Sequence, residues 1–400
     1  MRVYLDHAAS APLRASAREA WLAATEHVGN AASTHGAGQA VRRMLEDARE
    51  RAAAVLGCEP IELVFTSGGT ESINTALRGL WAARRPGTEV LVLPDAEHHA
   101  TLDTAAALTA EGARVRPVPV DGLGRIDVPA FAAALADGPD VGADESRTGA
   151  GGPVALATAL VANNEVGTVN DAAALSAAAA RAQVPLHLDA VAACGQLSLS
   201  FRGLRGDADD GAGLVAMSLA GHKIGAPAGT GALVVARTAR LAPLLHGGAQ
   251  QRGLRAGTQD VAGAVALATA LEEAEAQRES ESVRLAALRD RLVDGIRRSV
   301  PAVVLLGDPV RRLPGNAHLL FPGAVGESLL FLLDMAGISA STGSACQAGV
   351  AEPSHVVMAM GRSERDARSV LRFTLGARST DADVDAVIAV IGDAVARASR

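Results

Sequence analysis

Short apolar runs alternate with helical stretches along the first 260 residues of this chain, and this alternation constrains the fold more than any other feature. Seven runs are predicted as strands: residues 62–65, 89–93, 115–120, 155–162, 185–188, 214–219 and 231–235. Strands separated by helices of ten or more residues favour βαβ units, so we predict an α/β fold with a large, mostly parallel sheet. Residues 138–153 and 206–213 are rich in Gly, Asp and Ala without an apolar period, which predicts mobile insertions.

The last 140 residues predict a second, smaller unit. Residues 261–298 form one long helical stretch that can link two domains. Beyond it we expect strands at 303–306, 317–321 and 370–375, and helices at 327–336 and 381–396. This mixture is typical of an α+β domain. We therefore divide the chain into a large domain, residues 15–260, and a small domain made of residues 1–14 and 261–400.

Composition excludes several classes of protein. With 49% hydrophobic and 20% charged residues, the chain can bury a large core and is not globally disordered. Its net charge of −7 disfavours a nucleic-acid-binding surface, and it has no run of apolar residues long enough to span a membrane. The chain starts without an apolar signal segment, so we expect a cytoplasmic protein. Its three cysteines lie far apart and form neither a disulfide framework nor a metal site.

One residue count points to chemistry. Of 37 basic residues, Lys223 is the single lysine and all the others are arginine. Lysine can lose its proton and form an imine, whereas arginine stays protonated. Taken alone, Lys223 is equally consistent with one exposed lysine left over in an arginine-biased composition. Its position decides between the two interpretations, because it follows a predicted strand in the sequence GHK and precedes a glycine-rich turn.

Polar clusters follow the other predicted strands as well, at the edge where parallel strands leave room for ligands. Asp189 ends one strand, where its carboxylate could cap a helix or keep a pyridine nitrogen protonated. Ser67-Gly68-Gly69-Thr70 opens a helix and suits a single phosphate, because the free N–H groups at a helix start attract anions. His98 is placed to stack on a flat cofactor ring, and the adjacent His98 and His99 point apart, which disfavours a metal site.

Cys346 lies in the run STGSACQAG, which contains no large apolar residue. We expect a mobile loop with an exposed thiol, which suits a nucleophile that must reach a substrate and then carry its product away. Cys58 and Cys194 have apolar neighbours and are predicted to pack in the core.

These motifs together resemble those of the cysteine desulfurases, which are class V, fold-type I pyridoxal-phosphate enzymes of the NifS and IscS kind. The matching motifs are VFTSGGTES, AEHHATLDT, VANNEVGTV, LDA, SLAGHKIGAPAGTGAL, HGGAQQRGLRAGTQD, STGSACQAGVAEPSHV and LRFTLG. The likeness runs from Tyr4 to beyond Gly376. The spacing from Cys346 to Glu352 is similar to that of the group that hands sulfur to a scaffold protein.

The resemblance implies a role for each matching residue. It implies that Lys223 carries the cofactor and moves substrate protons, and that Cys346 takes the sulfur as a persulfide. At the cofactor ring, it implies that His98 stacks on the face, that Asp189 pairs with the pyridine nitrogen, and that Asn164 lies near the ring hydroxyl and the substrate. The residues implied to bind the phosphate are Gly69, Thr70, His222 and, from a partner subunit, Thr258. Arg372 with Asn30 would bind the substrate carboxylate. The implied assembly is a homodimer that acts on L-cysteine and passes sulfur to an iron–sulfur scaffold or a thiolation enzyme.

Two positions depart from the family pattern. Ala192 stands where the family usually has a glutamine that bonds the ring oxygen, and Ala220 where it usually has a serine that bonds the phosphate. Ser218, two residues away, would face the same side of the strand without reaching as far. The two losses bear on cofactor affinity and rate more than on the class of reaction. The leading prediction is a cysteine desulfurase; the alternatives are a selenocysteine lyase or another class V enzyme, and a paralogue weakened at Ala192 and Ala220 that has a partner-binding role.

Overall fold

A computed structural model describes residues 2–136, 151–343 and 352–399. The large sheet has seven strands in the order β2-β8-β7-β6-β5-β3-β4. All seven were predicted; their bounds are β2 (Leu63–Thr66), β3 (Val90–Pro94), β4 (Arg114–Val118), β5 (Val154–Leu160), β6 (Pro185–Asp189), β7 (Gly213–Ala220) and β8 (Gly231–Val235). Five of them, β4, β3, β5, β6 and β7, run parallel, while β8 lies antiparallel between β7 and β2. The predicted, mostly parallel sheet is therefore confirmed.

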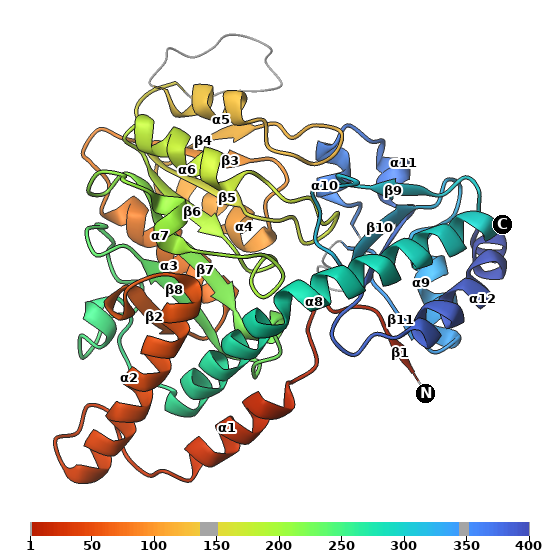
Figure 1. The fold of residues 1–400 in the computed structure, drawn as a ribbon. Coiled ribbons are helices and arrows are strands. Elements are labelled where there is room, and N and C mark those ends of the chain that lie inside the picture. The colour runs from red at the N-terminus through yellow and green to blue at the C-terminus, as the bar shows by residue number, and fades with distance from the viewer. Residues whose placement is uncertain (1, 137–150, 344–351, 400) are drawn as a thin grey trace.

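Helices cover both faces of this sheet (Figure 1). They are α2 (Gly36–Leu56), α3 (Gly69–Ala82), α4 (His99–Thr109), α5 (Val128–Leu135), α6 (Ala172–Arg181) and α7 (Phe201–Arg205). Helix α1 (Ala15–Thr25) packs along helix α8 (Val261–Ser299) instead. One face packs its apolar residues with α2, α5, α6 and α7, and the other with α3 and α4. Because side chains alternate along a strand, Leu188 and Leu219 enter the first core while Asp189 and Ala220 face the opposite side.

A second sheet and its helices form a separate core. This antiparallel sheet has the order β12-β10-β9, and a short parallel pair joins β1 to β11. The elements of this core are β1 (Val3–Tyr4), β9 (Val304–Leu306), β10 (Asn316–Leu320), β11 (Ile338–Ser339), β12 (Val370–Thr374), α9 (Gly326–Met335) and α12 (Asp381–Ala398). Two short helices, α10 (His355–Ala359) and α11 (Glu364–Ala367), pack their apolar residues in the large core instead. Helix α8 (Val261–Ser299) runs from the large sheet to this core (Figure 1). Its first half packs in the large core and its second half in the small one.

The two predicted insertions have different outcomes. Most of residues 138–153 lies outside the described residues. Residues 206–212 form turns between α7 and β7, and Arg205 holds them through its bonds to the carbonyls of Ala208, Asp209 and Ala212. Their mobility stays a prediction. Within the described residues, no helix is long and apolar enough to cross a membrane.

Candidate active site

A cavity of about 340 Å³ opens at the carboxyl edge of the parallel strands. The turns that follow β2, β3, β5, β6 and β7 all contribute to it, as expected for an α/β sheet. The residues that line it are Ser67, Gly68, Gly69, Thr70, Glu71, Ile73, His98, Leu160, Asn164, Asp189, Val191, Ala192, Ala220, His222, Lys223 and Gly229. Seven of the site residues predicted from the sequence therefore meet in one place: Gly69, Thr70, His98, Asn164, Asp189, His222 and Lys223.

Lys223 ends a 3₁₀ turn, Gly221–Lys223, that follows β7 directly. Its ammonium nitrogen, Nζ, donates to the carbonyl of Ala9 at 3.1 Å and also to that of Ala8. Burial, together with the positive charge of Arg372, lowers the pKa of Lys223 to about 8. The amine can therefore be neutral and nucleophilic near physiological pH, which an exposed lysine cannot be.

Asp189 is the last residue of β6, and its side chain is 2% exposed. Its Oδ1 accepts the N–H of Val191 at 2.9 Å and lies 3.5 Å from the hydroxyl of Ser218. Burial raises its pKa to about 6, while these bonds and the charge of Lys223 favour the ionised form. The hydrogen bonds described for this carboxylate both end on Oδ1. Oδ1 of Asp189 therefore caps the turn after β6, while Oδ2 accepts none of these hydrogen bonds and is available to a ligand.

The glycine turn before α3 presents backbone donors to the cavity. Gly68 has φ of +152°, a conformation that favours glycine, and α3 begins at Gly69 without a side-chain cap. A Cβ on Gly69 would lie 2.8 Å from Val191 Cγ2, so close packing also requires glycine there. The N–H groups of the first turn and the side chain of His222 line the same cavity. Such a helix start binds a phosphate group well.

His98 lines the cavity and caps α4. Its Nδ1 accepts the N–H of Ala100 at 3.0 Å, which fixes the ring at the start of the helix. Burial and the nearby positive charge of Lys223 lower the pKa of His98 to about 4. The ring is therefore neutral at physiological pH and can lie flat against an aromatic ligand without competing for its charge.

Arg372 reaches this region from β12 of the second sheet. It is 4% exposed, donating from Nη1 to the Asn164 carbonyl at 3.0 Å and from Nη2 to Asp6 Oδ1 at 2.9 Å. Its Nε is buried and has no hydrogen-bond partner among the described residues. Sequence reasoning missed the pairing with Asp6, for which the only signal is its place in the matching segment Tyr4-Leu5-Asp6.

Asn30 and Thr258 do not line the cavity of about 340 Å³ that contains Lys223, which we call the lysine cavity. Both are exposed, and both line a different cavity of about 570 Å³ beside α2. Within one chain, the structure therefore does not bring Asn30 to Arg372 or Thr258 to Gly69.

Ser218 does not line the cavity, so it is not placed to compensate for Ala220. Its hydroxyl is fully buried and bonds His187 Nε2 at 3.1 Å, while Nδ1 of the same ring bonds Thr158 Oγ1 at 2.9 Å. Neither His187 nor Ser218 lines the cavity, whereas Ala220 does. The register of the parallel strands sets Ser218 opposite Asp189, so its hydroxyl supports that carboxylate instead of the phosphate end.

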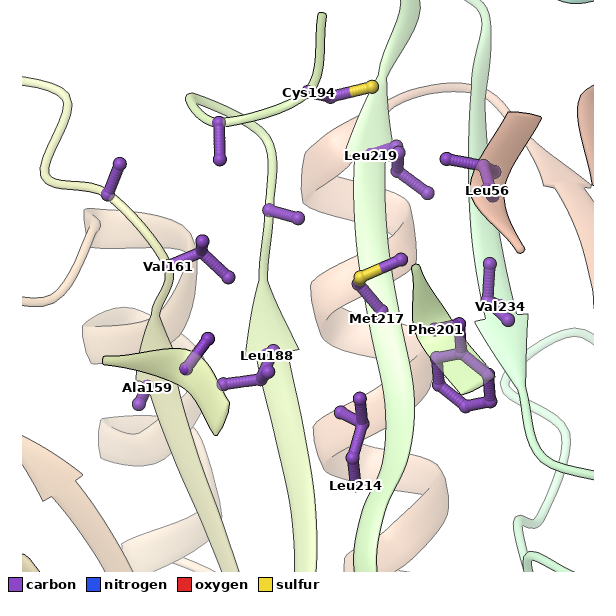
Figure 2. Close-up of a cluster of buried hydrophobic side chains, with 14 of the residues drawn as sticks. Leu56, Ala159, Val161, Leu188, Cys194, Phe201, Leu214, Met217, Leu219 and Val234 are labelled. Atoms are coloured by element: carbon purple, nitrogen blue, oxygen red, sulfur yellow. The ribbon is translucent and has the colours of Figure 1, made fainter. Parts of the chain in front are cut away.

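The two described cysteines are unsuited to nucleophilic work. Cys58 and Cys194 are buried free thiols, and Figure 2 shows Cys194 beside Leu219 at the edge of an apolar cluster. Burial raises the pKa of both thiols to about 12, so almost no thiolate forms at neutral pH. Their predicted packing role is confirmed. Cys346 lies outside the described residues.

Sequence reasoning also missed Glu97, a fully buried acid behind the cavity. Its Oε1 accepts the N–H of Leu160 at 2.8 Å, while Oε2 has no partner among the described residues. Burial and the charge of Asp189 raise its pKa to about 8, so Glu97 is mostly protonated at pH 7. A neutral Glu97 leaves Asp189 as the charged carboxylate of the pair. The sequence feature that could have indicated Glu97 is its position directly before His98 and His99.

Replacing Glu97 with glutamine is expected to stabilise the protein at alkaline pH. The folded-state pKa is raised, so wild-type stability falls as pH increases from about 4.5 to 8 and stays low above that. Glutamine removes this dependence and can donate to Thr101 Oγ1, which is also unpartnered in the described chain. The gain at pH 8.5 should be roughly 1–3 kcal/mol in urea unfolding. Equal pH slopes for both proteins between pH 5 and 8.5 would contradict this assignment.

Comparisons with known proteins agree with one another. The aminotransferase class V family matches residues 3–387. The chain is 46% identical to an IscS-like cysteine desulfurase of Mycobacterium tuberculosis, covering 99% of this chain and 97% of that protein. It is 38% identical to a cysteine desulfurase IscS of Methanosarcina thermophila, covering 98% and 92%. A solved structure described as a NifS-like protein superposes with a TM-score of 0.87 at 30% identity, covering 99% of this chain and all of the other.

Proposed function

Because this chain belongs to the class V aminotransferases and is a cysteine desulfurase of the IscS and NifS kind, we propose that its lysine cavity binds pyridoxal 5′-phosphate and that Cys346 accepts the sulfur of L-cysteine. The observation that carries the proposal is the meeting of Lys223, Asp189 and the Gly68-Gly69 turn in one cavity. The family is pyridoxal-phosphate-dependent, and this donor set suits such a cofactor. Of the functions considered from the sequence, the named relatives favour a cysteine desulfurase over a selenocysteine lyase or a partner-binding paralogue.

The residues present fit the cofactor at each of its polar ends. The start of α3, with Thr70 and His222, would hold the phosphate, and Asp189 would hold the ring nitrogen protonated through its open Oδ2. His98 would cover the ring face, and Asn164 would lie near the ring hydroxyl. When bound, pyridoxal phosphate withdraws electrons from the α-carbon of an amino acid, which acidifies that carbon.

The chain's own groups would bind the substrate and move its protons. Arg372 donates to the carbonyl of Asn164, which lines the cavity, and its guanidinium would bind the carboxylate of L-cysteine. That charge would compete with Asp6 for the same guanidinium. Lys223, with its lowered pKa, would take a proton from the α-carbon in its neutral form and return it in its ammonium form. Cys346, as a thiolate, would attack the substrate sulfur and form an S–S bond, while the bond between that sulfur and the β-carbon of the substrate breaks. The electron pair of the broken bond would stay with the β-carbon, which takes up a proton to give alanine, and Cys346 would retain the sulfur as a persulfide.

We further propose that the site lies between two domains, residues 15–260 and residues 1–14 with 261–400. Lys223 comes from the large sheet, Arg372 from the small sheet and Ala8 from the N-terminal segment. Lys223 lines the cavity and donates to the carbonyl of Ala8, while Arg372 donates to the carbonyl of Asn164, which also lines the cavity. The split packing of α8 between the two cores supports this division.

A homodimer would account for the two site residues that lie apart. Thr258 and Asn30 are exposed and share one cavity, so a second copy could bring both to the lysine cavity of its neighbour. In this proposal Thr258 completes the phosphate site of the other subunit, and Asn30 assists Arg372. The acceptor of the sulfur would be an iron–sulfur scaffold or a thiolation enzyme. We place the protein in the cytoplasm, where a reducing environment keeps thiols free.

The visible absorption spectrum tests the proposed function. The purified protein should show a yellow band, which should change when L-cysteine is added while alanine and protein-bound sulfur form in equal amounts. If the band is absent, or does not change when L-cysteine is added, the result would instead indicate a partner-binding paralogue that no longer catalyses the reaction.

Restoring the two missing donors is expected to tighten cofactor binding. Ala192 and Ala220 both line the cavity, so Ala220→Ser and Ala192→Gln would add a hydroxyl and an amide within it. A hydrogen bond to a charged group contributes ~1.5–3 kcal/mol, so Ala220→Ser should slow cofactor loss on dialysis by about ten-fold or more. Ala216→Ser, at a buried position of β7 that does not line the cavity, is the control. No gain from either substitution would show that other groups already replace both donors.

A further inference from the structure

Three polar side chains form a buried row beneath the lysine cavity. They are Thr158 of β5, His187 of β6 and Ser218 of β7, and all three are fully buried. Each stands two positions before a residue that lines the cavity, namely Leu160, Asp189 and Ala220. Because side chains alternate along a strand, the row lies on the same face of the sheet as the cavity, one layer deeper. Helix α3 packs against the same strands, so the row has to satisfy its hydrogen bonds within the protein.

The row is a continuous chain of hydrogen bonds that ends on Asp189. Thr158 Oγ1 lies 2.9 Å from Nδ1 of His187, and Nε2 of the same ring lies 3.1 Å from Ser218 Oγ. The Ser218 hydroxyl donates to Asp189 Oδ1 at 3.5 Å. The same Oδ1 accepts the N–H of Val191 at 2.9 Å. The chain therefore links three neighbouring strands to the carboxylate at the end of β6.

A charged carboxylate gives this chain a direction. Ionised Asp189 can only accept hydrogen bonds, so Ser218 must donate its hydroxyl hydrogen to Oδ1. Ser218 then accepts from His187, which places the ring hydrogen on Nε2 and leaves Nδ1 to accept from the Thr158 hydroxyl. Every donor in the row points toward Asp189, and each hydrogen bond polarises the next. The opposite direction would set the lone pairs of Ser218 against a negative charge.

His187 has the charge state that such a chain requires. Burial lowers the pKa of His187 to about 3, so the ring is neutral at physiological pH. A neutral imidazole has one donor and one acceptor, which suits a link between two hydroxyl groups. The row therefore adds no net charge near Asp189, and it favours the ionised carboxylate through hydrogen bonding alone.

The row opposes the effect of burial, which raises the pKa of Asp189 to about 6. The charge of Lys223 also favours the ionised form, while Glu97 is mostly protonated at pH 7. The titratable groups that surround this carboxylate or share its cavity are Lys223 and His222 after β7, Glu97 and His98 after β3, Glu71 of α3 with its partner Arg255, and Arg372 of β12, whose charge acts on Lys223. None of them belongs to the row, so changing the row leaves all of them in place.

We propose that Thr158, His187 and Ser218 form a positioning relay, which keeps Asp189 ionised and holds its Oδ1 so that Oδ2 meets the ring nitrogen of the cofactor. The proposal rests on the function proposed above, in which Asp189 pairs with that nitrogen. The relay keeps the proton of this pair on the ring nitrogen instead of on the carboxylate. A protonated ring withdraws electrons from the substrate more strongly. The three residues do not line the cavity, so they act only through Asp189.

The first test locates the proton. Wild-type protein, Ser218→Ala and Thr158→Val are loaded with pyridoxal phosphate labelled with nitrogen-15 in the ring, and the NMR resonance of that nitrogen is recorded. Wild type should show a protonated pyridine. In Ser218→Ala the resonance should move toward that of neutral pyridine, because the lost bond raises the proton affinity of the carboxylate by about ten-fold, the lower end for a bond to a charged group. Thr158→Val keeps the side-chain shape and should give a smaller shift in the same direction.

The second test needs no cofactor. Wild-type Asp189 has a raised pKa in the folded state, so its contribution to stability is lost as pH rises from about 4 to 6. Ser218→Ala raises that pKa further and should extend the loss to about pH 7. In urea unfolding of the cofactor-free protein, the ratio of variant to wild-type unfolding constants should be about ten-fold larger at pH 8 than at pH 5. A merely structural role for Ser218 would give the same ratio at both values.

Two further variants complete the comparison. Ser176→Ala removes another buried hydroxyl, on α6, which has no hydrogen-bond partner among the described residues. It should leave the ring nitrogen resonance unchanged and give a ratio of unfolding constants that does not depend on pH. Combining Thr158→Val with Ser218→Ala should move the resonance no further than Ser218→Ala alone, because Thr158 acts only through Ser218.

The possible failures are distinct. If wild type shows a protonated ring nitrogen and both Ser218→Ala and Thr158→Val show the same resonance, the relay is wrong and the proposed function stands. A stability loss in Ser218→Ala that is equal at pH 5 and pH 8 would also overturn the relay. If Ser218→Ala does not fold, Thr158→Val decides by the same two readouts. If wild type binds no pyridoxal phosphate, or holds it with a neutral ring nitrogen, the pairing with Asp189 is wrong and the proposed function fails with it.

Discussion

Replacing Lys223 with alanine is expected to reduce alanine formation from L-cysteine by at least about 100-fold, the lower range for losing a proton-transfer group alone. The variant also loses the amine that would bond pyridoxal phosphate, so the visible band should disappear or shift and dialysis should remove the cofactor. Lys223→Arg should be equally inactive, because a guanidinium keeps the charge but cannot form an imine.

The single lysine makes this prediction unusually clean to check. After borohydride reduction of the wild-type protein, mass spectrometry should find the cofactor on the peptide that contains Lys223 and nowhere else. The chain has no other lysine, so the N-terminal amine is the one competing site. Labelling at the N-terminus, or activity in Lys223→Ala within ten-fold of wild type, would contradict the assignment.

The position of the cavity was predictable because it follows from strand order. Asp189, His98 and Lys223 each stand at the end of an apolar run, and parallel strands must bring such ends to one edge. Local signals of this kind need no knowledge of long-range packing. For the same reason, the predicted strands differ from the observed ones by only a few residues at their ends.

What the sequence did not reveal depends on contacts between distant segments. Asp6 meets Arg372 because the N-terminal segment pairs with β12 at Thr374, near the other end of the chain. Ser354 meets Glu165 because α10 lies against the turn after β5. Alternation along the strand identified the face of Ser218 and its shorter reach, but not its partner. His187, on the neighbouring strand, bonds its hydroxyl.

Burial also assigns charge states that no sequence pattern could supply. It lowers the pKa of His98 to about 4 and that of Lys223 to about 8, and raises that of Glu97 to about 8. At physiological pH His98 and Glu97 are therefore mostly neutral, whereas Asp189, Arg372 and most of Lys223 are charged. Glu71, which also lines the cavity, is charged as well, because, in spite of its burial, hydrogen bonds from Arg255 and Ser67 lower its pKa. Asp189 and Arg372 are the two charges that the proposed function needs, one for the ring nitrogen and one for the substrate carboxylate.

Replacing Cys346 with serine is expected to separate substrate binding from sulfur transfer. Neither the Lys223 amine nor the Arg372 guanidinium depends on a thiol, so the variant should keep its cofactor and its spectral change with L-cysteine. Alanine and persulfide formation should fall on the order of 1,000-fold, because a serine hydroxyl is far less acidic than a thiol and a poor nucleophile toward sulfur.

Cys58→Ser and Cys194→Ser are the matched controls for this change. Both thiols are buried with a pKa of about 12, so they provide almost no thiolate at neutral pH and cannot substitute for Cys346. These variants should lose some stability, since a buried hydroxyl replaces an apolar group, yet form alanine at close to the wild-type rate. If Cys346→Ser instead forms alanine at an undiminished rate, the sulfur leaves without a covalent carrier, as expected of a lyase. A loss of persulfide in Cys194→Ser at full stability would move the acceptor role to a thiol that the fold encloses, which would require the core shown in Figure 2 to open during each turnover.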